Sequence, residues 1–217
     1  MNLSRSAIAG LLLASACGVV QAKPIAFSQG TTVMAEYGAG TMNEAQVFYA
    51  PRYFLSLGGG YLELDSDIDA RRREITYARL NYLLRRWNLE AAQANVFTWA
   101  SAGQAYVSES NRHEFAWNAG AQLDYETRRI YASMKTDLHH ASAFEHRIDT
   151  LQLGIAPYEH DFDTLATWFV VQGRRITGGI HEGTEWSLLV RLFKRGAWIE
   201  AGATTDGKLQ AMFMANF

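Results

Sequence analysis

The sequence predicts an all-β protein: a closed antiparallel up-and-down β-barrel of about twelve strands, within a range of about ten to fourteen, preceded by a cleaved signal peptide. From residue 31 onward, apolar and polar residues alternate in many runs of roughly ten residues, which is the period of a β-strand. Polar or glycine-rich turns separate these runs. No convincing amphipathic helix and no membrane-length apolar run occurs in this part of the chain.

The N-terminal residues have the pattern of a secretory signal peptide. Arg5 supplies a short basic region, residues 7–20 form an apolar run, and Ala22 completes a small-residue cleavage site. The apolar run is shorter than the roughly 20 residues that a spanning helix needs. We therefore expect removal of residues 1–22, with residues 23–217 forming a single barrel domain.

Two other interpretations of the N-terminus stay open, a lipoprotein signal and a buried helix. Cys17 follows small residues, as in a lipoprotein signal, although Ala14 stands where that pattern prefers Leu. Cleavage after Ala22 would remove Cys17, the single cysteine, and leave a secreted chain without disulfides or thiol chemistry. The formal net charge of −2 gives no electrostatic basis for binding nucleic acid.

Each predicted strand is an alternating run bounded by turn signals. The predicted strands are residues 31–38, 44–50, 53–64, 74–84, 95–107, 114–125, 130–138, 146–157, 165–174, 184–193, 197–203 and 208–217. The predicted connections are residues 38–43, 51–52, 65–73, 85–93, 108–113, 127–129, 139–145, 159–163, 177–183, 194–196 and 206–207. An even number of strands places both termini at one end of the barrel, and the odd-numbered connections at the other end.

The last strand carries a resemblance to a class of proteins. Residues 208–217 alternate strictly, and the apolar face ends at Phe217. This resembles the closing strand of Gram-negative outer-membrane β-barrel proteins. The resemblance implies a transmembrane barrel in the cell outer membrane, with both termini in the periplasm. The signal peptide would direct its secretion through the inner membrane. The resemblance also implies contact with outer-membrane lipid and lipopolysaccharide, recognition of the strand ending in Phe217 by the outer-membrane assembly machinery, and a monomer.

Alternation alone does not decide which face points outward, because a soluble lipocalin-like barrel or β-sandwich alternates as well. Two features favour the membrane barrel. Charges of both signs and amides occur in mid-strand, as expected of a wet lumen. In residues 114–125, Phe115 and Trp117 at one end and Leu123 and Tyr125 at the other flank small residues, as expected where a strand crosses two membrane interfaces.

The first functional hypothesis is a narrow pore, or a transport accessory, for small polar solutes or ions. The residues expected to line its lumen are Arg79, Glu114, Lys135, Arg174, Arg191 and Glu200. The competing interpretation of these charges is structural, since opposed charges can fill a narrow barrel and stabilise it.

The second hypothesis is a non-conducting surface barrel that binds copper or zinc. His139, His140 and His146 lie in or beside one predicted loop, and imidazole suits these metals, although their spacing matches no closed zinc motif. If the first and last strands pair, Met34 approaches Met212 and Met214, and thioethers select copper(I). Exposed loop histidines and space-filling methionines are the competing interpretations. No other cofactor is expected.

The third hypothesis is an outer-membrane lipid-modifying enzyme. Ser142 lies near the same three histidines, and Asp149 follows them. Nucleophilic catalysis needs a Ser–His hydrogen bond with a third, orienting group, which proximity in sequence does not supply. The chain has no GxSxG nucleophile elbow.

Overall fold

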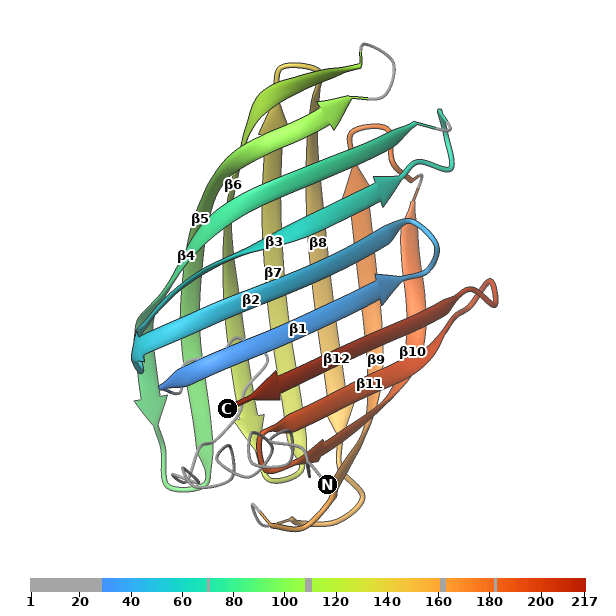
Figure 1. Cartoon of the computed structure of the whole chain (residues 1–217). Coiled ribbons are helices and arrows are strands. Elements are labelled where there is room, and N and C mark those ends of the chain that lie inside the picture. Colours follow the sequence, from blue (N-terminus) through green and yellow to red (C-terminus); the bar gives the residue numbers. More distant parts are fainter. Residues whose placement is uncertain (1–28, 70, 108–110, 161–162, 182) are drawn as a thin grey trace, which may run out of the picture.

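A computed structural model describes residues 29–69, 71–107, 111–160, 163–181 and 183–217. The predicted signal peptide and Cys17 lie outside these residues. The described chain forms a closed barrel of twelve antiparallel strands, each paired with its neighbours in sequence and the last paired with the first (Figure 1). The predicted all-β, antiparallel, twelve-stranded closed barrel is confirmed. Among the described residues, no helix is long and apolar enough to cross a membrane.

The strands agree with the predicted runs and are often longer. They are β1 (Gly30–Gly38), β2 (Met42–Arg52), β3 (Leu55–Asp65), β4 (Arg72–Asn88), β5 (Ala92–Val107), β6 (Arg112–Thr127), β7 (Ile130–Ala141), β8 (Phe144–Ile155), β9 (Ala166–Thr177), β10 (Thr184–Lys194), β11 (Ala197–Thr204) and β12 (Leu209–Asn216). We call the end at which β1 begins and β12 ends the terminal end, and the opposite end the distal end. Strands β4, β5 and β6 are the longest, so the wall is tallest there (Figure 1).

The predicted pairing of the first and last strands is also present. Met34 lies opposite Met214, and Glu36 lies opposite Met212. Beyond the ladder, the amide of Thr31 donates to the carbonyl of Phe217 at 3.0 Å, and the amide of Phe217 donates back at 2.8 Å. The sheet therefore has no open edge, and its backbone groups are paired within the barrel.

Three predicted connections are wrong. Residues 51–52 were predicted as a tight turn, but they end β2, and the turn lies at residues 53–54. Residues 85–93 were predicted as a connection, but β4 continues to Asn88 after a bulge between Leu83 and Arg85. Residues 139–145 were predicted as a loop, but β7 runs to Ala141 and β8 begins at Phe144. In β7 the alternation of more and less buried side chains continues through His139 and His140, and in β4 the ladder resumes beyond the bulge, so backbone pairing extends through both stretches.

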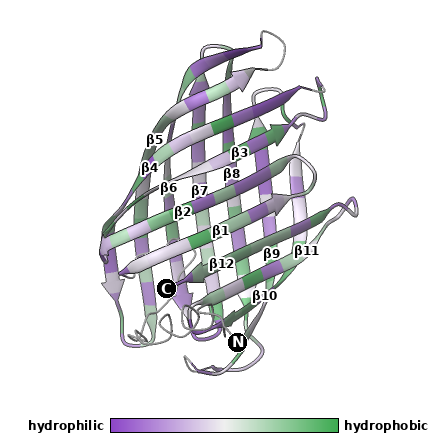
Figure 2. Cartoon of the chain, viewed as in Figure 1, coloured by the Kyte–Doolittle hydropathy of each residue, from purple (hydrophilic) through white to green (hydrophobic). Residues whose placement is uncertain are grey.

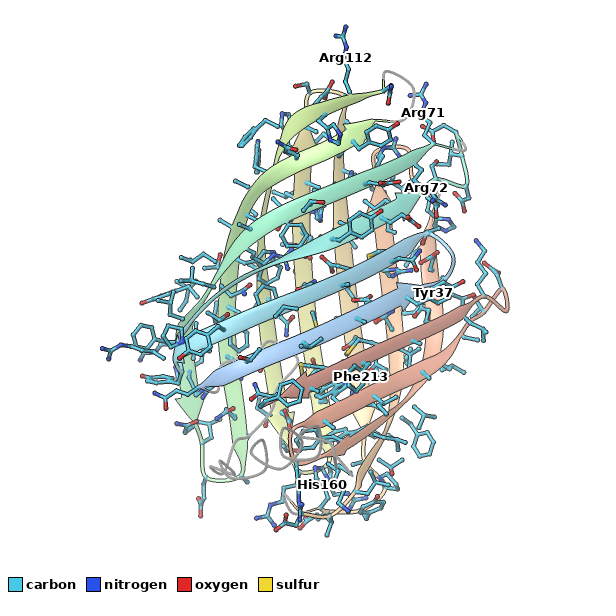
Figure 3. All side chains as sticks on the ribbon, viewed as in Figure 1. Tyr37, Arg71, Arg72, Arg112, His160 and Phe213 are labelled. Atoms are coloured by element: carbon cyan, nitrogen blue, oxygen red, sulfur yellow. The ribbon has the colours of Figure 1, made fainter. Side chains whose placement is uncertain are left out.

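The length of a connection does not distinguish the two ends of the barrel. The odd-numbered connection between Ala141 and Phe144 is a tight turn, whereas the even-numbered one between Ile155 and Ala166 is long and lies at the terminal end. Figure 3 places Arg71, Arg72 and Arg112 at the distal end and His160 at the terminal end.

Polarity is inverted relative to a soluble barrel. The buried polar side chains include Gln122, Asp137, Arg174 and Arg191, all of which face inward. Large apolar side chains cover the outside, for example Leu188 at 69% exposure (Figure 2 shows the alternation along the strands). In β6, the predicted apolar face is the exposed face, whereas the predicted polar face includes buried Asn118 and Asp124.

These inward polar side chains form a belt around the middle of the interior, which we call the polar belt. Apolar layers cross the interior on its distal side and on its terminal side. The largest apolar cluster includes Leu62 and Leu64 of β3, Ile75 of β4, Ile148 of β8 and Ile176 of β9. These residues stand near the distal ends of their strands, and each is at most 4% exposed. Smaller clusters around Trp168, Phe97 and Trp198 include residues near the terminal end.

The distal apolar layer is expected to contribute strongly to stability. Replacing the fully buried Leu64 with Ala should lower the free energy of unfolding by about 2–5 kcal/mol, because it leaves a cavity in a packed layer. Urea titration of the folded protein in detergent would measure this loss. Ile68→Ala is the control, since Ile68 is 49% exposed in the β3–β4 connection and its loss should cost about 0.5 kcal/mol or less. Equal losses of unfolding free energy for Leu64→Ala and Ile68→Ala would contradict a tightly packed apolar layer at the distal end.

Candidate functional site

The polar belt surrounds a cavity in the middle of the barrel. The cavity has a volume of about 120 Å³, enough for several water molecules. Its lining comes from strands all around the barrel and includes Glu36, Gln46, Lys135, Gln172 and Gln210. Carboxylates, guanidinium groups, an ammonium group and amides thus face one another across a small space inside the barrel.

Arg79 of β4 is held by three strands. Its guanidinium donates to the Asn118 side-chain oxygen at 3.2 Å and to that of Gln46 at 3.4 Å, and it lies 3.9 Å from the Glu44 carboxylate. The Tyr77 ring lies 4.8 Å from the guanidinium carbon, and the Tyr77 hydroxyl donates to Glu44 at 2.5 Å. These contacts fix a buried cation in place with a charged partner nearby.

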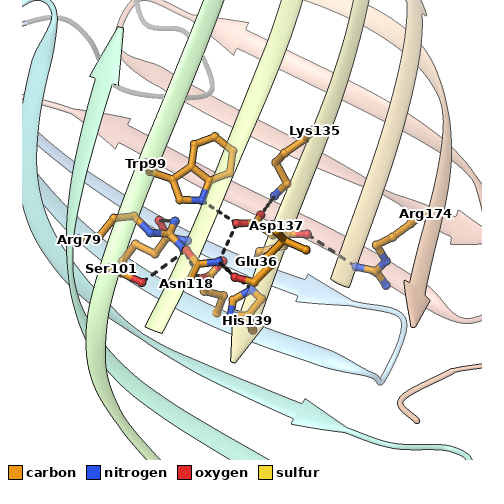
Figure 4. A network of polar contacts seen from close by, with 12 residues as sticks. Glu36, Arg79, Trp99, Ser101, Asn118, Lys135, Asp137, His139 and Arg174 are labelled. Atoms are coloured by element: carbon orange, nitrogen blue, oxygen red, sulfur yellow. Dashed lines mark hydrogen bonds and ion pairs between the residues drawn. The ribbon is translucent and has the colours of Figure 1, made fainter. Parts of the chain in front are cut away.

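Asp137 of β7 is the second centre of the network (Figure 4). One carboxylate oxygen accepts from the indole nitrogen of Trp99 at 2.6 Å and from the Asn118 amide at 3.1 Å. The other oxygen lies 3.5 Å from the ammonium of Lys135. Trp99 reaches Asp137 across β6 because Gly120 has no side chain, and a Cβ there would overlap the indole ring. Asn118 therefore joins the Arg79 and Asp137 groups into one network.

Arg174 of β9 forms a nearly fully buried ion pair. Its Nε and Nη2 donate to one oxygen of Glu185 at 2.9 and 2.7 Å, and both side chains are 2% exposed. Its Nη1 points towards Glu36 of β1 at 3.8 Å. Gly38 leaves the space that this guanidinium occupies, since a Cβ at that position would overlap it.

A row of hydrogen-bonded charged and amide side chains lines the part of the interior formed by β8 to β12. Arg191 donates to Glu200 at 2.6 Å and to Gln152 at 2.8 Å. The row continues from Gln152 to Gln172 at 2.7 Å and from Gln172 to Gln210 at 2.9 Å. The Arg191 guanidinium carbon also lies 4.4 Å from the Tyr131 ring and 4.2 Å from the Trp198 ring, in cation–π contact with both.

Five of the six residues expected to line the lumen face the interior: Arg79, Lys135, Arg174, Arg191 and Glu200. The sixth, Glu114, lies near the distal rim, where its carboxylate accepts from the amide of Ala143 at 2.9 Å.

Several interior partners were not among the predicted site residues, including Asp137, Asn118, Glu44, Glu185 and Trp99. Each alternates in phase with another inward residue of its own strand, so strand parity was the signal that could have found them. Their pairing across the barrel had no local signal in the sequence.

The three histidines do not come together. His139 and His146 are buried and directly opposite each other, with rings stacked at 4.8 Å. His140 points to the outside, where its Nδ1 lies 3.1 Å from Glu145. Stacked imidazole rings hold their nitrogen lone pairs in parallel planes, which do not converge on one ion. Within the described parts of the chain, no group of three or more His, Cys, Asp or Glu residues is placed to hold a metal.

The residues of the other two predicted arrangements have different surroundings. Ser142 occupies an exposed turn, whereas Asp149 lies beside Arg147, whose Nε donates to it at 2.8 Å. Met34, Met212 and Met214 do gather inside the seam, but they pack with Trp198 and Phe193 in an apolar cluster. This packing corresponds to the space-filling role of methionine.

No family model and no curated protein matches this chain. The fold and the site themselves define a closed twelve-stranded β-barrel with a charged, hydrogen-bonded interior.

The Arg174–Glu185 pair allows a quantitative test. Arg174→Met should lower the free energy of unfolding by about 3–5 kcal/mol, because Glu185 would keep a buried charge without its partner. Arg174→Met combined with Glu185→Leu should recover most of that loss, since both charges are then removed. Urea titration of the single and double variants would measure the coupling. Additive losses would contradict a tightly coupled pair.

Proposed function

We propose that this protein is a monomeric outer-membrane β-barrel that serves as a narrow pore, or a transport accessory, for small polar solutes or ions. The observation that carries the proposal is the inverted polarity of the barrel: charges and amides inside, large apolar side chains outside. Such an exterior is costly in water, whereas in a bilayer it is the favourable surface. A closed sheet also satisfies its own backbone hydrogen bonds, as lipid requires.

The distribution of exposed aromatic residues supports the same placement. Tyr37, Tyr61 and Trp117 stand towards the distal ends of their strands, and Tyr49 and Tyr125 stand towards the terminal ends. The exposed residues between these levels are mainly aliphatic or small, including Val47, Leu57, Leu80, Leu151 and Val190. Two aromatic levels around an aliphatic band are typical of a barrel that crosses two membrane interfaces. Outer-membrane lipid and lipopolysaccharide would then contact this band and its distal edge.

The cavity supports the choice of solute. Its lining carries both signs of charge together with amides, beside apolar side chains such as Phe48 and Leu189, and the charged and amide groups offer partners to small hydrated ions and polar molecules. The apolar layer stands on the distal side of the cavity, and we take it to close the path there. The described conformation is therefore the closed state of the proposed pore.

That same apolar layer favours a second candidate, a non-conducting structural barrel. In this alternative, the paired charges only fill and stabilise the interior. Copper or zinc binding by the three histidines would need a rearrangement, because His140 faces away from the stacked His139 and His146. A lipid-modifying activity would need one as well, because Asp149 is held by Arg147 and Ser142 stands in an exposed turn.

Conductance separates a pore from a structural barrel. Purified protein in planar lipid bilayers should show discrete conductance steps. Asp137→Asn should change the ratio of cation to anion permeability, because it removes a charge from the cavity lining. Glu114→Gln is the matched control at the rim and should leave the ratio closer to that of the wild type. Absence of any steps in the wild type would favour the structural barrel.

The membrane placement has its own test. The protein should fractionate with outer membranes and should migrate differently in SDS gels before and after boiling, because a closed barrel resists detergent until it is heated. A periplasmic soluble protein with an unchanged gel position would contradict the placement.

A further inference from the structure

The connection between β9 and β10 reaches across the distal mouth of the barrel. In the ring of twelve strands, β9 and β10 lie opposite β3 and β4. Nevertheless, the carbonyl of Ile180 accepts from the amide of Asp67, in the β3–β4 connection, at 3.0 Å. The carbonyl of Gly179 accepts from the hydroxyl of Ser66 at 2.6 Å. Residues 178–181, which we call the strap, therefore bridge two opposite sides of the mouth.

The strap also completes the distal apolar layer. Ile180 is 0% exposed and belongs to the cluster formed by wall residues such as Leu64, Ile75 and Ile148. The strap passes close to β8, because a Cβ at Gly178 would overlap the carbonyl of Glu145. Gly178 and Gly179 have φ values of 92° and 82°, which disfavour other residues. The backbone is thus shaped to place Ile180 inside the mouth.

A small set of polar contacts holds the strap at its far side. The Nδ1 of His181 lies 2.6 Å from a carboxylate oxygen of Asp67. Lys208, from the β11–β12 connection, lies 3.7 Å from the same oxygen. Asp67 therefore joins three connections, and its side chain is 37% exposed to solvent. The walls are instead held by continuous ladders of backbone hydrogen bonds.

We infer that the strap is the gate of the barrel, with Ile180 as its plug and Asp67 as its fastening point. The inference rests on the proposed pore. The strap can leave the mouth by breaking a few contacts between connections, whereas no wall residue of the apolar layer can leave without disrupting the sheet. Its departure opens the distal layer above the charged cavity, and its return closes that layer.

Chemical labelling tests the gate without relying on conductance. Ile180→Cys is introduced as a reporter, and its reaction rate with a membrane-impermeant maleimide is measured on folded protein. Asp67→Asn should raise that rate about tenfold, the factor that corresponds to the loss of about 1.4 kcal/mol of fastening. Asp65→Asn is the matched control, because Asp65 pairs with Arg72 of its own hairpin at 2.9 Å. It should leave the rate unchanged.

The same substitutions, without the reporter, are then compared in planar bilayers. Asp67→Asn should raise the fraction of time spent open, and Asp65→Asn should not. Faster labelling without conductance would support a movable strap and contradict the pore. Equal labelling rates for the Asp67 and Asp65 variants would overturn the gate whether or not the barrel conducts. The shift in gel migration on boiling verifies that each variant is folded.

Discussion

Closure of the sheet through the β1–β12 seam is the constraint on which the other features depend. Once Thr31 and Phe217 exchange hydrogen bonds at the end of that ladder, every strand has two neighbours, and one face of every strand is enclosed. Enclosure then sets the rule for the interior, because a charge removed from water needs a partner. The close pairs Arg174–Glu185 and Arg191–Glu200 satisfy that rule.

At two positions, a glycine provides the space that a charged or aromatic interior side chain occupies. Arg174 is a large side chain in a crowded layer, and Gly38 on a distant strand provides its space. Gly120 does the same for Trp99, which would otherwise not reach Asp137. Small residues on one strand therefore determine which charged and aromatic side chains can meet across the lumen. This arrangement leaves a cavity at the level of the polar belt and packs the levels above and below it.

The predicted strand count and seam follow from local patterns, as residues 208–217 illustrate. There the alternation, Phe217 and the preceding Asp206-Gly207 turn are all visible in the sequence. The histidines show where local reasoning failed. His139 and His140 looked like loop residues because they are polar and clustered, yet β7 continues through them and sends one inward and the other outward. A cluster in sequence becomes two separate environments when the backbone is extended, since successive side chains point to opposite faces.

The sequence by itself determined the class of fold, the number of strands and the face on which most side chains lie, because strand period and turn chemistry are local properties. Only the tertiary structure decided which interior residues pair, where the cavity lies, and that Ile180 and Asp67 meet across the mouth. Those features depend on ring closure and strand register, which bring together residues more than a hundred positions apart. No period or motif within a single strand encodes such a meeting.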